Sequence, residues 1–513
     1  MPCHRTVLRA LSISLGLASP ALAQSDVAFP KEVYAERRTR LVRDLADAVV
    51  VVPGRYLVSP GDELVKQDPN FWYLTGVESP YAILVMTLDR APRGGESAWR
   101  RWRSTLFLPT EYQFAGAQFP MIDNAFRRAV WNRPPRRLVP GRAAIEATGV
   151  DMTAPLDSFV PRFKELSRGA TALYVPVGAP PYAPPGLTPP ASLGAPFAQS
   201  VATLVPGAQV RDVTPLLTRL RLVKDRHEID ALRKAAEISG KGIVEAMRAT
   251  RPGMNDREIA GLMEYVWKRE GSPRASFPPI VMSGPNAMTL FTLQRERYNA
   301  GDHVMRAGEL LFIDYGAAEW MTYTSDLCRT IPVSGQFTPE QRKYYDIVLE
   351  AQEAAIAAIR PGVMMVDVIR KAAEVFRRHG LEQYENVATM GADHVWGVMP
   401  SPTHYLARSA GVTRYSASGT GVRDLGHHVG LEATDGRDYA RPLQAGMVIT
   451  IEPKLYIPDL QIAIMIEDEI LVTPDGYDVL SAQVPKKAED IERVMAEGRG
   501  ARAWERPGGR SPG

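Results

Sequence analysis

Cysteine, histidine and net charge are all scarce in this chain of 513 residues. Its two cysteines, Cys3 and Cys328, allow at most one internal disulfide, so the fold must be stabilised by packing or by bound metal. A formal net charge of +3 gives no strongly basic surface, and we expect no nucleic acid partner. Apolar residues at 45% and charged residues at 23% exclude a wholly disordered, fibrous or multi-span membrane chain.

The first residues have the pattern of a secretory signal. Arg5 and Arg9 accompany an apolar stretch over residues 10–17, and Ala21-Leu22-Ala23 has the form of a cleavage site. The stretch is too short to span a bilayer comfortably. We therefore expect residues 1–23 to be a cleaved signal peptide, and the mature protein to be periplasmic or secreted and free of the membrane. A retained anchor is the alternative.

Residues 24–213 alternate helical and strand-like segments, which is typical of an α/β domain. Short β-branched or apolar runs predict strands at 48–52, 83–87 and 105–108. A proline-rich segment over residues 175–196 cannot be helix or central strand, so we expect a loop or linker there. We expect this domain to be non-catalytic.

Residues 214–486 contain an internal repeat. Arg251-Pro252-Gly253 and Arg360-Pro361-Gly362 lie 109 residues apart, and each separates two helical segments of which the second ends at a glycine. A chance likeness of amphipathic helices is the alternative. The repeat predicts a duplicated α+β domain with a site between its halves. Residues 487–513 are predicted to be a C-terminal extension with a disordered end.

Acidic residues recur beside the apolar strands of this domain. Burial of an unpartnered carboxylate is costly, and surface positions at strand edges would explain any one of these acids alone. Four of them in one domain, together with a histidine, indicate a pair of hard or borderline divalent ions. These residues are Asp314, Asp326, His427, Glu452 and Glu467.

The sequence around these residues resembles the pita-bread metallopeptidases of the Xaa-Pro aminopeptidase and prolidase type. The likeness includes Asp314-Tyr315-Gly316, Ser325-Asp326, Glu452-Pro453 and Glu467-Asp468. It extends upstream to the segments Leu220–Ile229 and Asn70–Gly76. It implies a pita-bread (creatinase/aminopeptidase-like) catalytic domain preceded by a creatinase-type N-terminal α/β domain. It also implies a homo-oligomer, a dimer or a tetramer.

The resemblance implies a role for each residue of the cluster. Asp314 would bind one metal, His427 and Glu452 the second, and Asp326 and Glu467 would bridge them. The metals are expected to be Mn²⁺, with Co²⁺ or Zn²⁺ as substitutes. A water between them would attack the peptide bond before a proline while Glu452 moves a proton. The implied activity is that of a secreted aminopeptidase or prolidase.

The residues expected to bind substrate depart from the family pattern. Three histidines are replaced by Phe291, Arg423 and Thr434, and an arginine is replaced by Met465. Arg423 suggests an anchor for an anionic substrate group and is our second catalytic candidate. The alternative is that it pairs with a nearby acid such as Asp424 or Asp435.

These departures leave a second function open, that of a non-peptidase small-molecule hydrolase or lyase on the same metal cage. A binding protein without turnover is disfavoured, because all five costly ligands are present. His303, His394 or His404 could replace the lost histidines, although polar loop positions are the simpler interpretation. Cys328 could face the metals, although an inert core thiol is the simpler interpretation.

Overall fold

The computed structural model describes residues 27–45, 48–55, 66–79, 81–88, 102–110, 138–178, 191–289, 301–315, 319–381, 425–436, 440–457 and 460–500. These residues form two compact units. The first comprises Met1–Pro176 and Phe197–Arg211, and the second Val177–Pro196 and Asp212–Gly513. The predicted signal peptide, residues 1–23, lies outside the described residues, as do residues 179–190 of the proline-rich segment.

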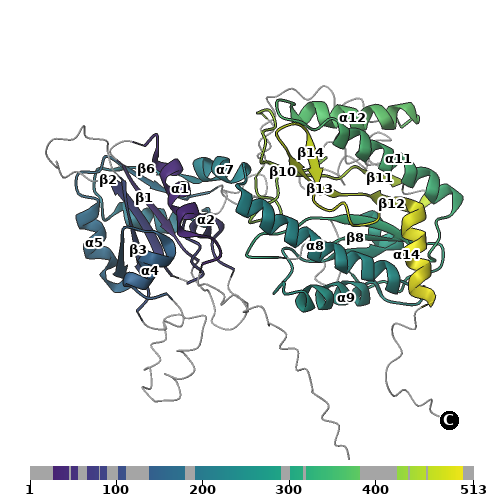
Figure 1. The fold of residues 1–513 in the computed structure, drawn as a ribbon, viewed down its shortest axis with the longest axis horizontal. Helices are drawn as coiled ribbons and strands as arrows, with labels where there is room; N and C mark the ends of the chain where they lie inside the picture. Colours follow the sequence, from purple (N-terminus) through teal and green to yellow (C-terminus); the bar gives the residue numbers. More distant parts are fainter. Residues whose placement is uncertain are drawn as a thin grey trace, which may run out of the picture. The chain divides into compact units, whose positions relative to one another are not determined.

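The first unit is built on a mixed six-stranded sheet in the order β4-β3-β2-β1-β5-β6 (Figure 1). The central strand β1 pairs antiparallel with β2 and parallel with β5. Consecutive residues of β1 are buried, so both faces of the sheet are covered. The three predicted strands are confirmed. The strands are β1 (Ala48–Pro53), β2 (Ile83–Leu88), β3 (Trp102–Leu108), β4 (Met152–Pro155), β5 (Ala172–Val175) and β6 (Gln209–Asp212).

Short helices pack on this sheet. The helix α2 begins after Asp68, whose carboxylate accepts hydrogen bonds from two backbone N–H groups, and it ends at Gly76 in the left-handed conformation (φ 68°). Phe71, Trp72 and Tyr73 of α2 are fully buried, so they are core residues. The helices are α1 (Lys31–Val42), α2 (Pro69–Thr75), α4 (Arg142–Thr148), α5 (Phe159–Leu166) and α6 (Ala195–Ala202), with a 3₁₀ turn η1 (Leu156–Ser158).

The second unit shows the predicted duplication. Helices α9 (Asp256–Arg269) and α12 (Met365–Arg378) are both 14 residues long and follow α8 (Arg226–Ala249) and α11 (Pro339–Ala357) in the same way. Before α9, Gly253 (φ 91°) donates its N–H to the carbonyl of Met305, and before α12, Gly362 (φ 88°) donates to Leu443. The same left-handed turn therefore attaches each helical pair to its own half. A further helix, α7 (Thr214–Leu222), precedes α8.

The strands of the second unit form three small sheets, β7-β8-β9, β11-β12 and β10-β13-β14. The two halves meet where β12 contacts β8 and β9. The strands are β7 (Ile280–Ser283), β8 (Leu310–Asp314), β9 (Cys328–Pro332), β10 (Val448–Ile451), β11 (Lys454–Ile457), β12 (Ile462–Met465), β13 (Asp468–Val472) and β14 (Tyr477–Val479), and a 3₁₀ turn η2 (Gly284–Thr289) follows β7.

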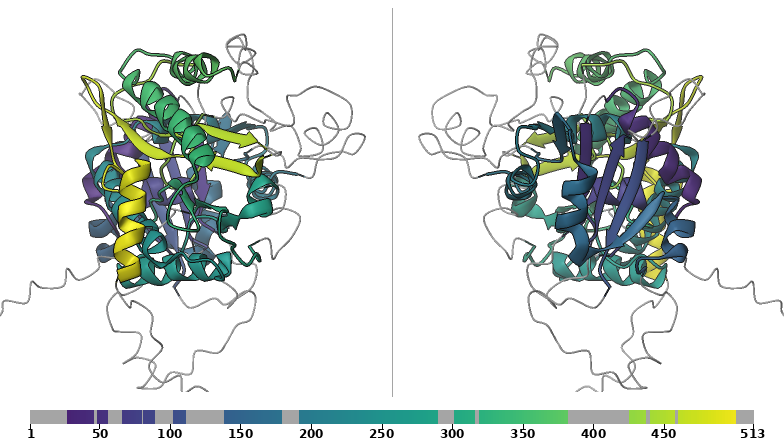
Figure 2. Two further views of the ribbon diagram at one scale, coloured as in Figure 1. Left: turned by 90° about the vertical axis from the view of Figure 1, so that its right-hand side faces the viewer. Right: turned by 90° about the vertical axis from the view of Figure 1, so that its left-hand side faces the viewer.

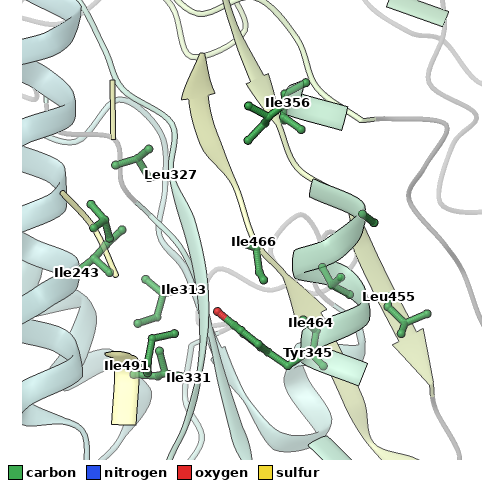
Figure 3. Packing of buried hydrophobic residues seen from close by; sticks show 14 of the residues in the cluster. Ile243, Ile313, Leu327, Ile331, Tyr345, Ile356, Leu455, Ile464, Ile466 and Ile491 are labelled. Atoms are coloured by element: carbon green, nitrogen blue, oxygen red, sulfur yellow. The ribbon is translucent and has the colours of Figure 1, made fainter. Parts of the chain in front are cut away.

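Alternate residues of these strands face two different apolar clusters. Ile313 of β8 and Ile331 of β9 pack with Ile243 of α8, and Ile464 of β12 packs with Tyr345 of α11 (Figure 3). Residues that point the other way form a second, smaller cluster between the strands of the two halves. This interior cluster consists of Ile280, Met282, Ala287, Phe312, Cys328, Ala463 and Met465.

The chain after residue 487 does not begin as a loose extension. Helix α14 (Ala488–Gly500) packs against α8 and α11 (Figure 2). Its Ile491 is fully buried. The sequence signal for disorder is strongest after Glu497, and residues 501–513 lie outside the described residues. No helix in the described ranges combines the length and apolar character needed to cross a bilayer.

Candidate metal centre

The first half of the second unit supplies two aspartates from one hairpin. Asp314 is the last residue of β8 and stands directly opposite Cys328, the first residue of β9. Asp326 lies two residues before β9, and its backbone N–H donates to Oε1 of Glu469 at 2.6 Å. Both aspartates are only 6% exposed. The antiparallel pairing therefore brings two carboxylates to the same end of the hairpin.

The second half supplies His427, Glu452 and Glu467. The backbone of His427 exchanges hydrogen bonds with Thr450 of β10, since its N–H donates to Oγ1 at 3.1 Å and its carbonyl accepts from the N–H at 2.8 Å. Gly426 is required beside it, because a Cβ there would lie 1.9 Å from the Thr450 carbonyl oxygen. Glu452 directly follows β10, and Glu467 lies between β12 and β13.

The structure brings the five predicted ligands together. Donor atoms of Asp326, His427 and Glu467 all lie within 4.8 Å of one another. Nε2 of His427 is 3.4 Å from Oδ2 of Asp326 and 3.8 Å from Oε1 of Glu452. Asp314 is close enough to Asp326 and Glu452 for their charges to act on it. We call Asp314, Asp326, His427, Glu452 and Glu467 the acidic centre.

The electrostatics of the acidic centre are unfavourable for the protein alone. Burial raises the pKa of Asp314 well above its ordinary value, and the charges of Asp326 and Glu452 raise it further. Burial and the same two neighbours also raise the pKa of Glu467. Oε2 of Glu467 is buried without a hydrogen-bond partner. Oxygen and imidazole donors in such a cluster fit hard or borderline divalent cations, which would remove the repulsion.

One residue beside the acidic centre is absent from the sequence-based prediction. Lys454 is 4% exposed, and its Nζ donates to Oε2 of Glu452 at 2.8 Å. A lysine two residues after a predicted ligand and at the start of an apolar strand is a usable signal, because a lysine is rarely buried unless it is paired.

A second set of buried acids has protein cations as partners. Arg329 donates to Oδ1 of Asp468 at 2.7 Å, and Lys486 donates to Oδ2 at 3.0 Å. Burial alone would raise the pKa of Asp468, but these two charges outweigh it and lower the pKa to about 2. We call Asp468, Arg329 and Lys486 the ion-paired cluster. It lies one residue along the chain from Glu467.

Another buried ion pair lies next to the His427 segment. Asp435 accepts hydrogen bonds from Arg221 and, at 3.1 Å, from Lys224. The N–H of Asp435 also donates to the carbonyl of His428 at 2.7 Å. Asp435 is one of the two acids named above as alternative partners of Arg423, which lies outside the described residues. In the structure, Asp435 pairs with two cations more than 200 residues earlier in the chain, which no local pattern could indicate.

The predicted substrate residues are only partly placed. Thr434 is exposed. Phe291, Arg423, Asp424, His394 and His404 lie outside the described residues. Nε2 of His303 lies 3.0 Å from Oε2 of Glu309, so its ring has an acidic partner outside the acidic centre.

Cys328 lies on the interior side of β9. The residue is fully buried in the interior cluster, and its Sγ lies 3.6 Å from the carbonyl oxygen of Met465. Burial raises the pKa of the thiol well above its ordinary value, and the charges of Asp314 and Glu467 raise it further. A thiol held protonated in this way is inert, which agrees with the simpler interpretation of the sequence.

Two family models match the chain. The one described as metallopeptidase family M24 matches residues 230–474. The one described as the N-terminal domain of aminopeptidase P matches residues 34–174. The first match lies within the second unit and the other within the first unit.

Full-length relatives and solved structures agree with these matches. The Xaa-Pro aminopeptidase of Escherichia coli (strain K12) is 30% identical over 485 residues, which are 91% of this chain and 98% of the relative. That of Haemophilus influenzae is 28% identical, over 91% of this chain and 97% of the relative. The structure of proline aminopeptidase P II from Yersinia pestis matches with a TM-score of 0.70 at 26% identity, over 91% of this chain and all of the other. The predicted resemblance and fold class are confirmed.

Proposed function

Because this chain belongs to metallopeptidase family M24 and is a metallo-aminopeptidase, we propose that it uses two divalent ions to hydrolyse the peptide bond before proline. The observation that carries the proposal is the acidic centre, in which donor atoms of three residues lie within 4.8 Å. The names of the relatives, Xaa-Pro aminopeptidases, support the substrate class. Mn²⁺ is the metal that the carboxylate-rich donor set suits.

The charge of the acidic centre favours two ions over one. Four carboxylates and the ammonium of Lys454 give the centre a net charge of −3, so a single divalent ion would leave a buried negative charge uncompensated. Asp314, Asp326, His427, Glu452 and Glu467 would hold the ions. When bound, the ions would lower the pKa of a water molecule and polarise the substrate carbonyl.

Glu452 is the residue of the centre that we assign to proton transfer. Oε2 of Glu452 is held by Lys454 at 2.8 Å, whereas Oε1 lies 3.5 Å from the hydroxyl of Thr450 and 3.8 Å from Nε2 of His427. Its Oε1 would accept a proton from the attacking water and return it to the leaving imino nitrogen of proline. A group in this role contributes typically about 10²–10⁴-fold to the rate.

The decisive experiment is a turnover assay on the full chain, first stripped with chelator and then reloaded with Mn²⁺, Co²⁺ or Zn²⁺. Peptides with proline in the second position are compared with matched alanine peptides. We expect metal-dependent release of the first residue from the proline peptides only. Silence on both peptides, with metal bound and turnover of other amides, would establish the small-molecule alternative instead.

A matched pair of variants separates loss of the centre from loss of the fold. Asp326→Asn removes a proposed ligand, whereas Asp256→Asn changes another fully buried aspartate of the same unit that contacts His303 and Ser283. We expect only Asp326→Asn to abolish turnover. Equal turnover in the two variants would contradict the assignment of the centre.

The export of the protein is a separate proposal. It is supported by the basic, apolar and Ala-x-Ala pattern of residues 1–23. N-terminal sequencing of protein from the periplasmic fraction should begin at Gln24. A homo-oligomer, proposed from the resemblance alone, is tested by light scattering on the same material.

A further inference from the structure

Lys454 projects into the interior between the two halves of the second unit. Strand β11 pairs antiparallel with β12, and Lys454 stands directly opposite Met465. Residues directly opposite in an antiparallel pair project on the same side of the sheet. Met465 belongs to the interior cluster, together with Phe312 and Cys328 of the facing sheet. The ammonium group of Lys454 therefore lies on the side of the interior cluster, beside the acidic centre.

The ammonium of Lys454 forms an ion pair with one proposed ligand, and its charge acts on two others. Nζ lies 2.8 Å from Oε2 of Glu452, and both side chains are less than 10% exposed. The positive charge also opposes the rise in pKa of Asp314 and of Glu467. In a buried site of low effective dielectric, a unit charge at such range strongly changes the free energy of a neighbouring cation.

Lys454 lies opposite a position at which the resemblance predicts a different cation. The resemblance predicts an arginine at position 465, where this chain has methionine. The residue across the strand pair from this methionine is Lys454. This chain thus carries a positive charge on the partner strand, where Lys454 contacts Glu452.

We propose that the charge of Lys454, which contacts Glu452 of the proposed second metal site, weakens that site and makes the affinities of the two metal ions unequal. The inference rests on the proposed function, since it assumes a two-metal centre. The first divalent ion enters a centre of net negative charge. The second must enter against the combined charge of that ion and of the lysine, so it binds more weakly. Occupancy of the second site, and with it activity, then follows the free metal concentration.

The test is a titration of the chelator-stripped full chain with Mn²⁺ by calorimetry, and with Co²⁺ by visible absorption. For wild type we expect two steps whose dissociation constants differ by on the order of 100-fold. In Lys454→Met the second dissociation constant should fall by on the order of 10-fold, and the two Co²⁺ spectral steps should move closer together. Lys454→Arg should keep the two separate steps.

Two further variants separate charge from packing. Lys454→Gln keeps a hydrogen-bond donor near Glu452 without the charge, and it should behave like Lys454→Met. Lys486→Met removes a lysine that is paired at 3.0 Å with Asp468, outside the acidic centre, and should titrate like wild type. Circular dichroism of each apoprotein establishes that it is folded.

The outcomes distinguish this inference from the proposed function. Identical titrations for wild type, Lys454→Met and Lys454→Gln would overturn the role of Lys454 while leaving the two-metal centre intact. Loss of the second site in Lys454→Met would overturn it too, because the lysine would then support metal binding. A wild-type chain that binds no divalent ion would overturn the proposed function, and this inference with it.

Discussion

Two neighbouring groups of buried acids in the second unit differ in where their counter-charge comes from. Glu467 and Asp468 are consecutive, and both are 1% exposed. Glu467 belongs to the acidic centre, where burial and neighbouring carboxylates raise its pKa. Asp468 belongs to the ion-paired cluster, where Arg329 and Lys486 overcome the effect of burial and lower the pKa to about 2.

The difference shows that neighbouring buried acids of one chain can serve different purposes, one group in stability and the other in the proposed chemistry. Consecutive residues of an extended segment point to opposite sides, so one carboxylate can face protein cations while the next faces other carboxylates. The ion-paired cluster is neutralised from within the protein. The acidic centre is only partly neutralised, by Lys454, and keeps a surplus of negative charge that an external cation can use. Such stored repulsion is a usual cost of a functional site.

The largest effect should come from removing Asp326, a carboxylate that we propose both metals share. Asp326→Ala should raise both metal dissociation constants by on the order of 1,000-fold, since a direct ligand matters more than the supporting residues that cost about 10–100-fold. Metal analysis after gel filtration measures the loss. Wild-type metal content in Asp326→Ala and in Glu467→Ala would contradict the ligand assignment.

The corresponding change in the ion-paired cluster should act on stability. Asp468→Asn leaves the fully buried Arg329 without its carboxylate, so the free energy of unfolding should fall by about 3 kcal/mol. Urea unfolding of the full chain measures it. Bound metal in the folded variant should remain at the wild-type stoichiometry. A loss of metal as large as that of Asp326→Ala would show that the two clusters are not separate.

Asp435 is a further buried acid whose charge is balanced by protein cations, and its contribution to stability should depend on pH. Burial would raise the pKa of Asp435, but Arg221 and Lys224 hold it below its ordinary value. The ion pair therefore stabilises the folded state above about pH 4, and this contribution is lost as the pH falls through the lowered pKa. Asp435→Asn should cost about 3 kcal/mol at pH 7. The difference from wild type should narrow below pH 4, and a difference that stays constant down to pH 3 would contradict the assignment.

In the metal-free protein, removing a charge from the acidic centre should increase the free energy of unfolding, whereas removing one from the ion-paired cluster decreases it. Glu467→Gln removes one repelling carboxylate, so the free energy of unfolding at pH 7 should rise by about 1 kcal/mol in the presence of chelator. With saturating Mn²⁺ the order should reverse, because the wild type gains more from binding. Thermal unfolding of wild type and Glu467→Gln, each with and without Mn²⁺, measures both differences in stability. Destabilisation of the metal-free variant would mean that Glu467 is already compensated.

The sequence could predict the parts of this fold that are repeated or local. The 109-residue offset places α9 and α12 at matching positions, because the same left-handed glycine turn recurs before each. The five residues of the acidic centre could be selected because acids beside apolar strands are unusual. The sequence could not show that Asp468 differs from Glu467, since its partner Arg329 is 139 residues away and only the fold brings them together.

Glu469 follows Asp468 and contacts Asp326, so it could belong to either group of buried acids. Its substitution should have the smallest effect. The residue is fully buried, Oε1 accepts the N–H of Asp326 at 2.6 Å, and Oε2 has no hydrogen-bond partner. Burial raises the pKa of Glu469 well above its ordinary value, which favours the neutral carboxyl. Glu469→Gln keeps the shape and the acceptor and mimics a neutral carboxyl, so stability should change by less than about 1 kcal/mol.

Metal titration of Glu469→Gln then decides to which cluster Glu469 belongs. A neutral carboxyl that only orients the backbone of Asp326 predicts a metal affinity within a few-fold of wild type, about the lower limit for a supporting residue. Glu469→Ala, which also removes the acceptor for the Asp326 N–H, should weaken binding by about 10-fold. If Glu469→Gln weakens binding as much as Glu467→Gln does, Glu469 is ionised and acts as a further ligand. Of the three consecutive acids Glu467, Asp468 and Glu469, Asp468 alone would then belong to the ion-paired cluster.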